Sequence, residues 1–147
     1  MFSRRIHQSL RATFAALAVS TALAGAFTRA FAKEYVEEHV MTVIAHAASG
    51  PLQCEIRRTE TAGAVSLTGF IASSRATKGS FRFTVTKSGA SGASNLHQGN
   101  AFDLAADRES QVGAVTINLD GDARVVVELS VESDDGLRCQ ASAAIKP

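Results

Sequence analysis

The stretch of residues 81–102 opens with Phe81-Arg82-Phe83-Thr84-Val85-Thr86-Lys87-Ser88-Gly89, in which apolar and polar side chains alternate. It continues as Ser91-Gly92-Ala93-Ser94-Asn95 and closes with Gln98-Gly99-Asn100-Ala101-Phe102. Successive side chains of a β-strand point to opposite faces, so the alternation predicts a strand with one buried and one wetted face. The small polar residues that follow are typical of a turn.

The same alternation recurs on both sides of this stretch. Apolar residues take nearly every second position in the segments 52–57, 65–71, 115–119, 125–131 and 137–145. Short turns such as Asp134-Asp135-Gly136 connect these segments, and Asp-Gly pairs are strong hairpin signals. With a weak strand near 94–97, the pattern gives about seven short strands, which predicts an all-β, antiparallel sandwich or barrel.

The order of features in residues 81–102, an alternating strand, a small-residue turn and a Gln-Gly segment ending on Phe102, resembles the CsgH branch of the CsgC-like curli assembly inhibitors. The likeness extends over roughly residues 52–145 as strand order and spacing. It implies an immunoglobulin-like β-sandwich, which we place at residues 51–147. It also implies a periplasmic protein that restrains polymerisation of a curlin-type amyloid subunit, its expected partner.

The N-terminal residues have the layout of a cleaved secretory signal. Arg4, Arg5 and Arg11 precede an apolar run over 13–27, and Ala30-Phe31-Ala32 supplies the small residues that a signal peptidase needs. A membrane anchor is the alternative, but the run is shorter than the ~20 apolar residues that span a bilayer. We therefore expect residues 1–32 to be removed on export to the periplasm, leaving no membrane attachment.

Residues 33–50 differ in pattern from the segments that follow. Val36, Val40, Val43, Ile44 and Ala47 recur at helical intervals, although 40–45 fits a short strand equally well. Gly50-Pro51 ends either element. We predict a flexible leader over 33–50 that lies outside the core.

The charge balance disfavours nucleic acid as a partner. The chain has 15 Lys and Arg against 14 Asp and Glu, and four of the arginines lie within residues 1–32. The exported part therefore keeps 11 basic against 14 acidic residues, a net charge of −3, whereas nucleic-acid binding requires clustered positive charge. We expect a monomer.

Cys54 and Cys139, 85 residues apart, are the only cysteines. Two cysteines of an exported domain usually pair, so the compartment favours a structural disulfide. A redox-active pair is the alternative, and it usually has the close Cys-x-x-Cys spacing that is missing here. If the first and last of the seven strands lie side by side, the bridge ties the ends of the domain together within one sheet.

The sequence offers little reactive chemistry. His39, His46 and His97 are the only histidines after residue 32, and with oxidised cysteines no converging set of three or four zinc ligands is evident, so solvated histidines are the better explanation. No Gly-x-Ser-x-Gly elbow accompanies the many serines. The acidic turns are better explained by aspartates that cap the backbone than by a weak calcium site. We predict no metal, no cofactor and no enzymatic activity.

The remaining candidates for function lie on the surface. In an immunoglobulin-like order, the third, sixth and seventh predicted strands form one sheet, and Arg82 and Arg138 flank Glu132 on its outer face. Such charges form weak cross-strand ion pairs, or they contact a disordered client. The residues predicted to bind the client are Arg82, Thr84, Lys87, Arg124 and Arg138. The alternative function is an exported immunoglobulin-like module that binds carbohydrate or another envelope protein.

Overall fold

The computed structural model describes residues 40–61, 63–90, 92–119 and 121–146, which belong to the compact unit Val36–Pro147. The predicted signal peptide (1–32) and the first part of the predicted leader (33–39), with His39, lie outside these residues. The described residues form eight antiparallel strands and no helix, so they include no helix that could cross a membrane. The strands are β1 Met41–Ser49, β2 Leu52–Thr61, β3 Ala64–Ser73, β4 Thr77–Gly89, β5 Gly92–Leu104, β6 Arg108–Asn118, β7 Arg124–Ser133 and β8 Arg138–Ile145.

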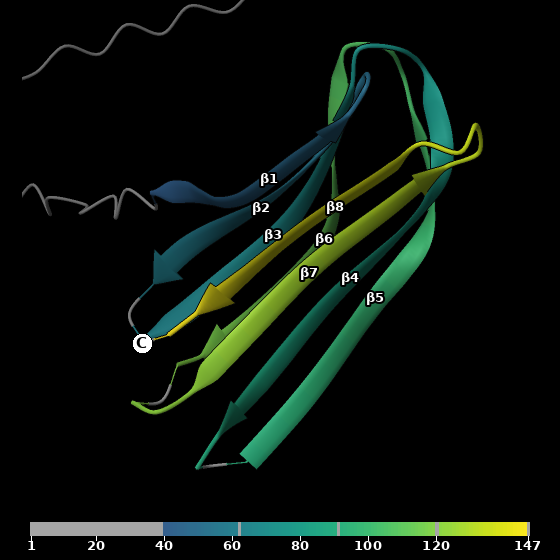
Figure 1. The fold of residues 1–147 in the computed structure, drawn as a ribbon. Helices are drawn as coiled ribbons and strands as arrows, with labels where there is room; N and C mark the ends of the chain where they lie inside the picture. The colour runs from purple at the N-terminus through teal and green to yellow at the C-terminus, as the bar shows by residue number, and fades with distance from the viewer. Residues whose placement is uncertain (1–39, 62, 91, 120, 147) are drawn as a thin grey trace, which may run out of the picture. The chain divides into compact units, whose positions relative to one another are not determined.

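The strands make two sheets that pack face to face (Figure 1). Sheet A has the order β1-β2-β3-β6, and sheet B has the order β5-β4-β7-β8. Leaving β1 aside, three strands pack on four as in an immunoglobulin domain. The third, sixth and seventh predicted strands are β4, β7 and β8, and β7 lies between the other two, antiparallel to both. The prediction of an all-β sandwich is confirmed.

Phe83 of β4 is the largest fully buried side chain of the core. Its ring lies against Gly69 of β3 and Gly113 of β6, which are neighbours in the sheet A ladder. A Cβ built on Gly113 would lie 2.8 Å from the Phe83 ring, closer than side-chain carbons approach one another. The two glycines therefore leave room for one aromatic ring, and this sets how closely the two sheets approach at the centre of the sandwich.

The prediction of a flexible leader over 33–50 is wrong for its second half. Residues 41–49 form β1, which pairs with β2 along its length, so the sandwich begins before residue 51. The register of β1 shifts between Val43 and Ala45, which marks a β-bulge. Ile44 and Ala45 are consequently both half-buried, and this breaks the period of two that would reveal a strand in the sequence.

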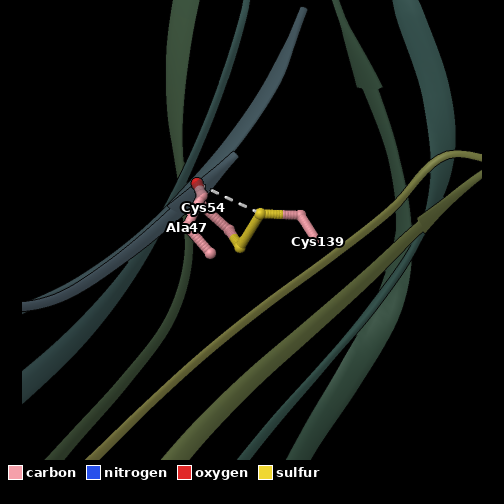
Figure 2. Close-up of a disulfide and its surroundings, with 3 residues drawn as sticks. All are labelled: Ala47, Cys54 and Cys139. Atoms are coloured by element: carbon pink, nitrogen blue, oxygen red, sulfur yellow. Dashed lines mark hydrogen bonds between the residues drawn. A yellow bond between two sulfur atoms is a disulfide. The ribbon is translucent and has the colours of Figure 1, made fainter. Parts of the chain in front are cut away.

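Cys54 and Cys139 form the predicted disulfide, with Cα atoms 6.0 Å apart (Figure 2). The expectation that the bridge lies within one sheet is wrong: Cys54 is on β2 of sheet A and Cys139 on β8 of sheet B, so the bond joins the two sheets. The reason is that β1 pairs with β2 on the side where β8 was expected. Cys139 Sγ also lies 3.3 Å from Ala47 O, a contact rather than a hydrogen bond because a disulfide sulfur carries no proton.

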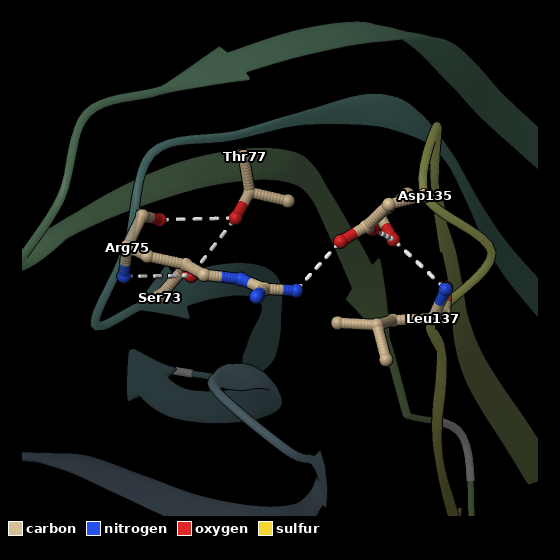
Figure 3. A network of polar contacts seen from close by, with 6 residues as sticks. Ser73, Arg75, Thr77, Asp135 and Leu137 are labelled. Carbon is tan, nitrogen blue, oxygen red and sulfur yellow. Dashed lines mark hydrogen bonds and ion pairs between the residues drawn. The ribbon is translucent and has the colours of Figure 1, made fainter.

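A network of polar contacts joins the β3–β4 loop to the β7–β8 turn (Figure 3). Arg75 Nη2 lies 2.6 Å from Asp135 Oδ2, and the hydroxyl of Ser133 donates to the other oxygen of the same carboxylate. The Leu137 N–H donates to Ser133 Oγ at 3.0 Å. The Ser133 hydrogen bond, together with the charge of Arg75, lowers the pKa of Asp135.

We expect this network to make the domain sensitive to acid. Because the pKa of Asp135 is lower in the folded state, its contribution is present above the unfolded value of about 4 and is lost as the pH falls through the folded pKa. Between pH 6 and pH 3 the free energy of unfolding should therefore fall less in Asp135→Asn than in the wild type, as measured by urea titration. Asp134→Asn is the matched control and should keep the wild-type pH dependence. Equal pH dependence in all three proteins would contradict this role.

Candidate functional site

The outer face of sheet B, called here the sheet B face, carries the predicted polar surface. Alternate residues of β4, β7 and β8 point away from sheet A and are exposed or half-buried, as the strand pattern predicted. They are Arg82, Thr84, Thr86, Arg124, Val126, Glu128, Ser130, Glu132, Arg138, Gln140 and Ser142. β5 extends this face beyond β4, since Gly99 lies opposite Arg82 and His97 opposite Thr84.

Two arginines and one glutamate meet at one end of this face. Arg138 lies directly opposite Glu132, and its Nη2 is 3.0 Å from Glu132 Oε1, with both side chains largely exposed. Arg82 is on β4, on the other side of β7 from Arg138, and it lies opposite Ser130 of β7. Among the residues that the structure describes, the side chain of Arg82 makes no hydrogen bond or ion pair, so its guanidinium faces solvent.

Arg82, Glu132 and Arg138 line an open hollow of about 620 Å³. Its other polar lining comes from Ser80, Asn100, Ser130 and Gln140. An open hollow lined by guanidinium, carboxylate, amide and hydroxyl groups suits the polar side chains of an extended polypeptide. It is too open to enclose a small molecule, because small-molecule sites bury most of the ligand surface.

Not all of the other predicted client-binding residues lie at this end of the sheet B face. Thr84 Oγ1 lies 3.2 Å from His97 Nδ1, next to Arg82 on the same face. Arg124 is on the same face, but it is six residues from Ser130 along β7, a distance of about 20 Å at the usual rise per residue. The structure thus brings Arg82 and Arg138 together around the hollow, with Thr84 beside Arg82, and it leaves Arg124 at the far end.

Lys87 does not belong to the sheet B face. It has the parity of Phe83 and Val85, which point toward sheet A, and its Nζ donates to Asn118 O of β6 at 2.8 Å. Because Lys87 lies near the end of β4, its side chain reaches the rim of the sandwich rather than the core. Its ammonium group links the two sheets.

The outer face of sheet A holds a charge cluster that the sequence did not reveal. Arg57 donates to both carboxylate oxygens of Glu109, at 2.9 and 2.6 Å, and also to Glu55. These hydrogen bonds raise the pKa of Arg57, and the bond to Glu109 has the largest effect. The only available signal was Glu55 and Arg57 two residues apart, because Glu109 is 52 residues away and lies on β6.

Phe70 lies beneath this cluster. The Arg57 guanidinium carbon is 3.9 Å from the Phe70 ring centre, a cation–π contact. A bulge in β3 near Gly69 would turn Phe70 into the core, but Phe70 stays on the outer face and is half-buried there. The irregularity in this ladder adds its extra residue to β6, so β3 keeps its regular alternation.

The histidines are dispersed. His46 lies on β1 opposite Glu55 and His97 lies on β5 beside Thr84, in different sheets. Within the described ranges, no three His, Cys, Asp or Glu side chains gather in a way that could hold a metal ion. Asp122 is used as a turn residue, as predicted, since its Oδ2 accepts from the Ala90 N–H at 2.8 Å.

These features define a small antiparallel β-sandwich whose two sheets are joined by one disulfide and whose sheet B face carries an open polar hollow. The family model described as CsgH protein matches residues 53–141, more than half of the chain. The chain belongs to the CsgH family, and the resemblance seen in the sequence is confirmed.

Two solved structures share the fold. The solution structure of R. palustris CsgH is 31% identical in sequence and matches with a TM-score of 0.51, over 60% of this chain and 89% of that one. The E. coli curli protein CsgC matches with a TM-score of 0.55 over 64% of this chain and 97% of that one. Its sequence is 17% identical, so this second likeness shows the fold alone. No curated protein matches the chain.

Proposed function

We propose that this chain is a non-enzymatic, exported inhibitor of curli subunit polymerisation. Membership of the CsgH family and the fold shared with a protein described as a curli protein support a role connected with curli. The observation that carries the proposal is the Arg82–Glu132–Arg138 end of the sheet B face, an open polar surface with one guanidinium facing solvent. A curlin-type subunit in an unfolded or early aggregated state is the proposed partner.

The proposed contact is weak and reversible because it is made by exposed charged and polar groups. Exposed ion pairs contribute about 0.2–1 kcal/mol each, and salt screens them over about 10 Å. A surface of this kind therefore engages a client briefly and releases it. During the contact, the client segment is not free to stack on an identical segment, which is the step that builds a cross-β fibril.

The disulfide is consistent with the proposed location in the periplasm. Disulfides persist in oxidising compartments and are rare in the cytosol. The signal-like layout of residues 1–32 supports the same location.

The direct test is a thioflavin growth assay with purified curlin subunit. Addition of the oxidised domain should lengthen the lag time before fibril growth in proportion to the amount added. A lag time that is unchanged over the whole range of concentrations would overturn the proposal.

Removing the two arginines should weaken inhibition without unfolding the domain. In Arg82→Gln/Arg138→Gln, two exposed charge contacts are lost, about 1 kcal/mol together, so about fivefold more protein should be needed for the same lag time. The difference should shrink as salt is added.

Arg108→Gln is the matched control for this pair. It makes the same chemical change at an exposed position on β6, in sheet A, and should inhibit like the wild type. If the double variant also inhibits like the wild type at low salt, the sheet B face is not the contact surface.

A further inference from the structure

β5 is a long edge strand. Its 13 residues, Gly92–Leu104, pair with β4 in unbroken register, and among the described residues no strand pairs with its other edge. Almost every side chain of β5 is exposed, whereas β2, β3, β4, β7 and β8 each carry several buried side chains. The strand therefore presents a row of main-chain donors and acceptors to solvent.

This edge lacks the features by which proteins usually prevent unwanted strand pairing. Such features are charged side chains, especially lysine, together with proline, bulges and short strands. β5 has no proline and no bulge, and its one charged residue, Asp103, is paired with Lys78 of β4 at 2.7 Å. The edge strand β1, by contrast, contains a bulge, and the edge strand β8 begins with Arg138.

The neighbouring edge, that of β6, is capped by a side chain from β5. Gln98 Nε2 donates to Ala114 O at 2.8 Å, and Gln98 Oε1 accepts from the Ala114 N–H at 3.0 Å. One amide side chain thus makes both of the hydrogen bonds that an added strand would make at that residue. On this side of the sandwich, strand pairing is blocked at the middle of β6 and left open on β5.

The main chain of β5 is open to a partner at Ala101. The Ala101 N–H donates to Asn100 Oδ1 at 2.9 Å, so it points away from β4 and is held only by the side chain of the preceding residue. Because the direction of the N–H alternates along a strand, the N–H groups of Gly99 and Asp103 also point to the free edge. A partner strand could replace the Asn100 side chain with a main-chain acceptor.

The side chains of β5 suit a partner of a particular composition. β5 carries three amide side chains, Asn95, Gln98 and Asn100, and only Gly99 stands between the last two. Stacked Asn and Gln side chains form ladders in cross-β assemblies. Gly99 and Asn100 also line the hollow that contains Arg82 and Arg138, so a strand added to β5 would lie beside this hollow.

We infer that the free edge of β5 accepts an extended, amide-rich strand of the polymerising subunit through main-chain hydrogen bonds. This inference rests on the proposed function and names the place where the subunit is held. The added strand would extend sheet B by one strand, and it would be withheld from pairing with copies of itself.

The test uses Ala101→Pro. Proline removes the N–H that points to the free edge and leaves the pairing with β4, which does not use this N–H. Ala101→Ser keeps the N–H and is the matched control. Circular dichroism and thermal melting check the fold, and the effect of each protein on the lag time of purified curlin subunit is compared. Amide hydrogen exchange of labelled wild-type protein is measured with and without monomeric curlin.

We expect curlin to slow exchange at Ala101 and Gly99 of the wild type at least tenfold. The concentration of Ala101→Pro that gives the same lag time should be at least fivefold higher than that of the wild type. The concentration of Ala101→Ser should equal that of the wild type. If Ala101→Pro does not fold, Ala101→Lys, which places a repelling charge on the edge, should give the same loss.

The other outcomes separate the two proposals. A folded Ala101→Pro that inhibits fully overturns the edge site and leaves the proposed function in place. A wild type that leaves the lag time unchanged, while curlin protects the β5 amides, supports the edge site and overturns the proposed function. Protection that appears without curlin as the domain is concentrated would show that a second copy of this chain occupies the edge, and it would overturn the inference.

Discussion

Replacing both cysteines, Cys54→Ala and Cys139→Ala, is expected to lower the free energy of unfolding by about 4 kcal/mol, a large part of the ~5–15 kcal/mol that a domain has. The bridge closes a loop of 85 residues, and in the chain-entropy model a loop of that length contributes about 4–5 kcal/mol. Alanine is preferred to serine because both positions are buried, and a buried hydroxyl without a partner has its own cost.

Urea unfolding of the oxidised wild type and the double variant measures this loss. The reduced wild type, kept in dithiothreitol, is the control and should match the variant to within about 1 kcal/mol, since it lacks the same link. A double variant that unfolds at the wild-type urea concentration would show that the bridge constrains the unfolded chain far less than its loop length implies.

Phe83→Ala is expected to lower the free energy of unfolding by about 3–5 kcal/mol. The Phe83 ring fills the space above Gly69 and Gly113, and neither glycine has a side chain that could move into the cavity left behind. The loss should therefore lie at the upper end of the range for buried aromatic residues. Urea unfolding of the oxidised protein is the measurement.

Phe83→Leu is the matched control for this cavity. Leucine keeps most of the buried volume, so its effect should stay below about 1.5 kcal/mol. If Phe83→Ala loses no more than Phe83→Leu, the two sheets must close over the vacated space, and the glycine pair does not set their separation.

Six of the strands could be predicted from the sequence because each has one buried face. In β7, for example, Val125, Val127, Leu129 and Val131 are buried while their neighbours are exposed or half-buried, and this gives a clear period of two. The order β4-β7-β8 followed from the immunoglobulin-like arrangement of such strands. The pairing of Cys54 with Cys139 followed from compartment and composition, which do not depend on register.

The strands that the sequence missed or shortened most are the edge strands β1, β5 and β6, the last of which was predicted only from residue 115 onward. β1 was read as a leader because Met41 and Val43 are half exposed and the bulge after Val43 gives its apolar residues a helix-like spacing. β5 was predicted only over 94–97, because a strand that is exposed on both faces has no hydrophobic period to detect.

The candidate site could be predicted only where it depends on strand parity. Parity placed Arg82, Thr84 and Arg138 on one face, and the pairing of Arg138 with Glu132 followed. It could not show that Gln98 would reach across to Ala114, or that Arg57 would meet Glu109. Those contacts depend on the path of the chain between strands that are not neighbours in the sequence.

The disulfide makes the two long sides of the sandwich unequal in their dynamics. It lies on the side where β8 contacts β1 and β2, whereas on the other side β5 and β6 are joined by the loop 105–107 at one end and by the Gln98 amide further along. Local opening is easiest where no covalent link is near, so transient separation of the layers is expected to begin at the ends of β5 and β6 that lie away from this loop. The layers stay tethered throughout, and a molecule that opens in this way can close again without a diffusive search.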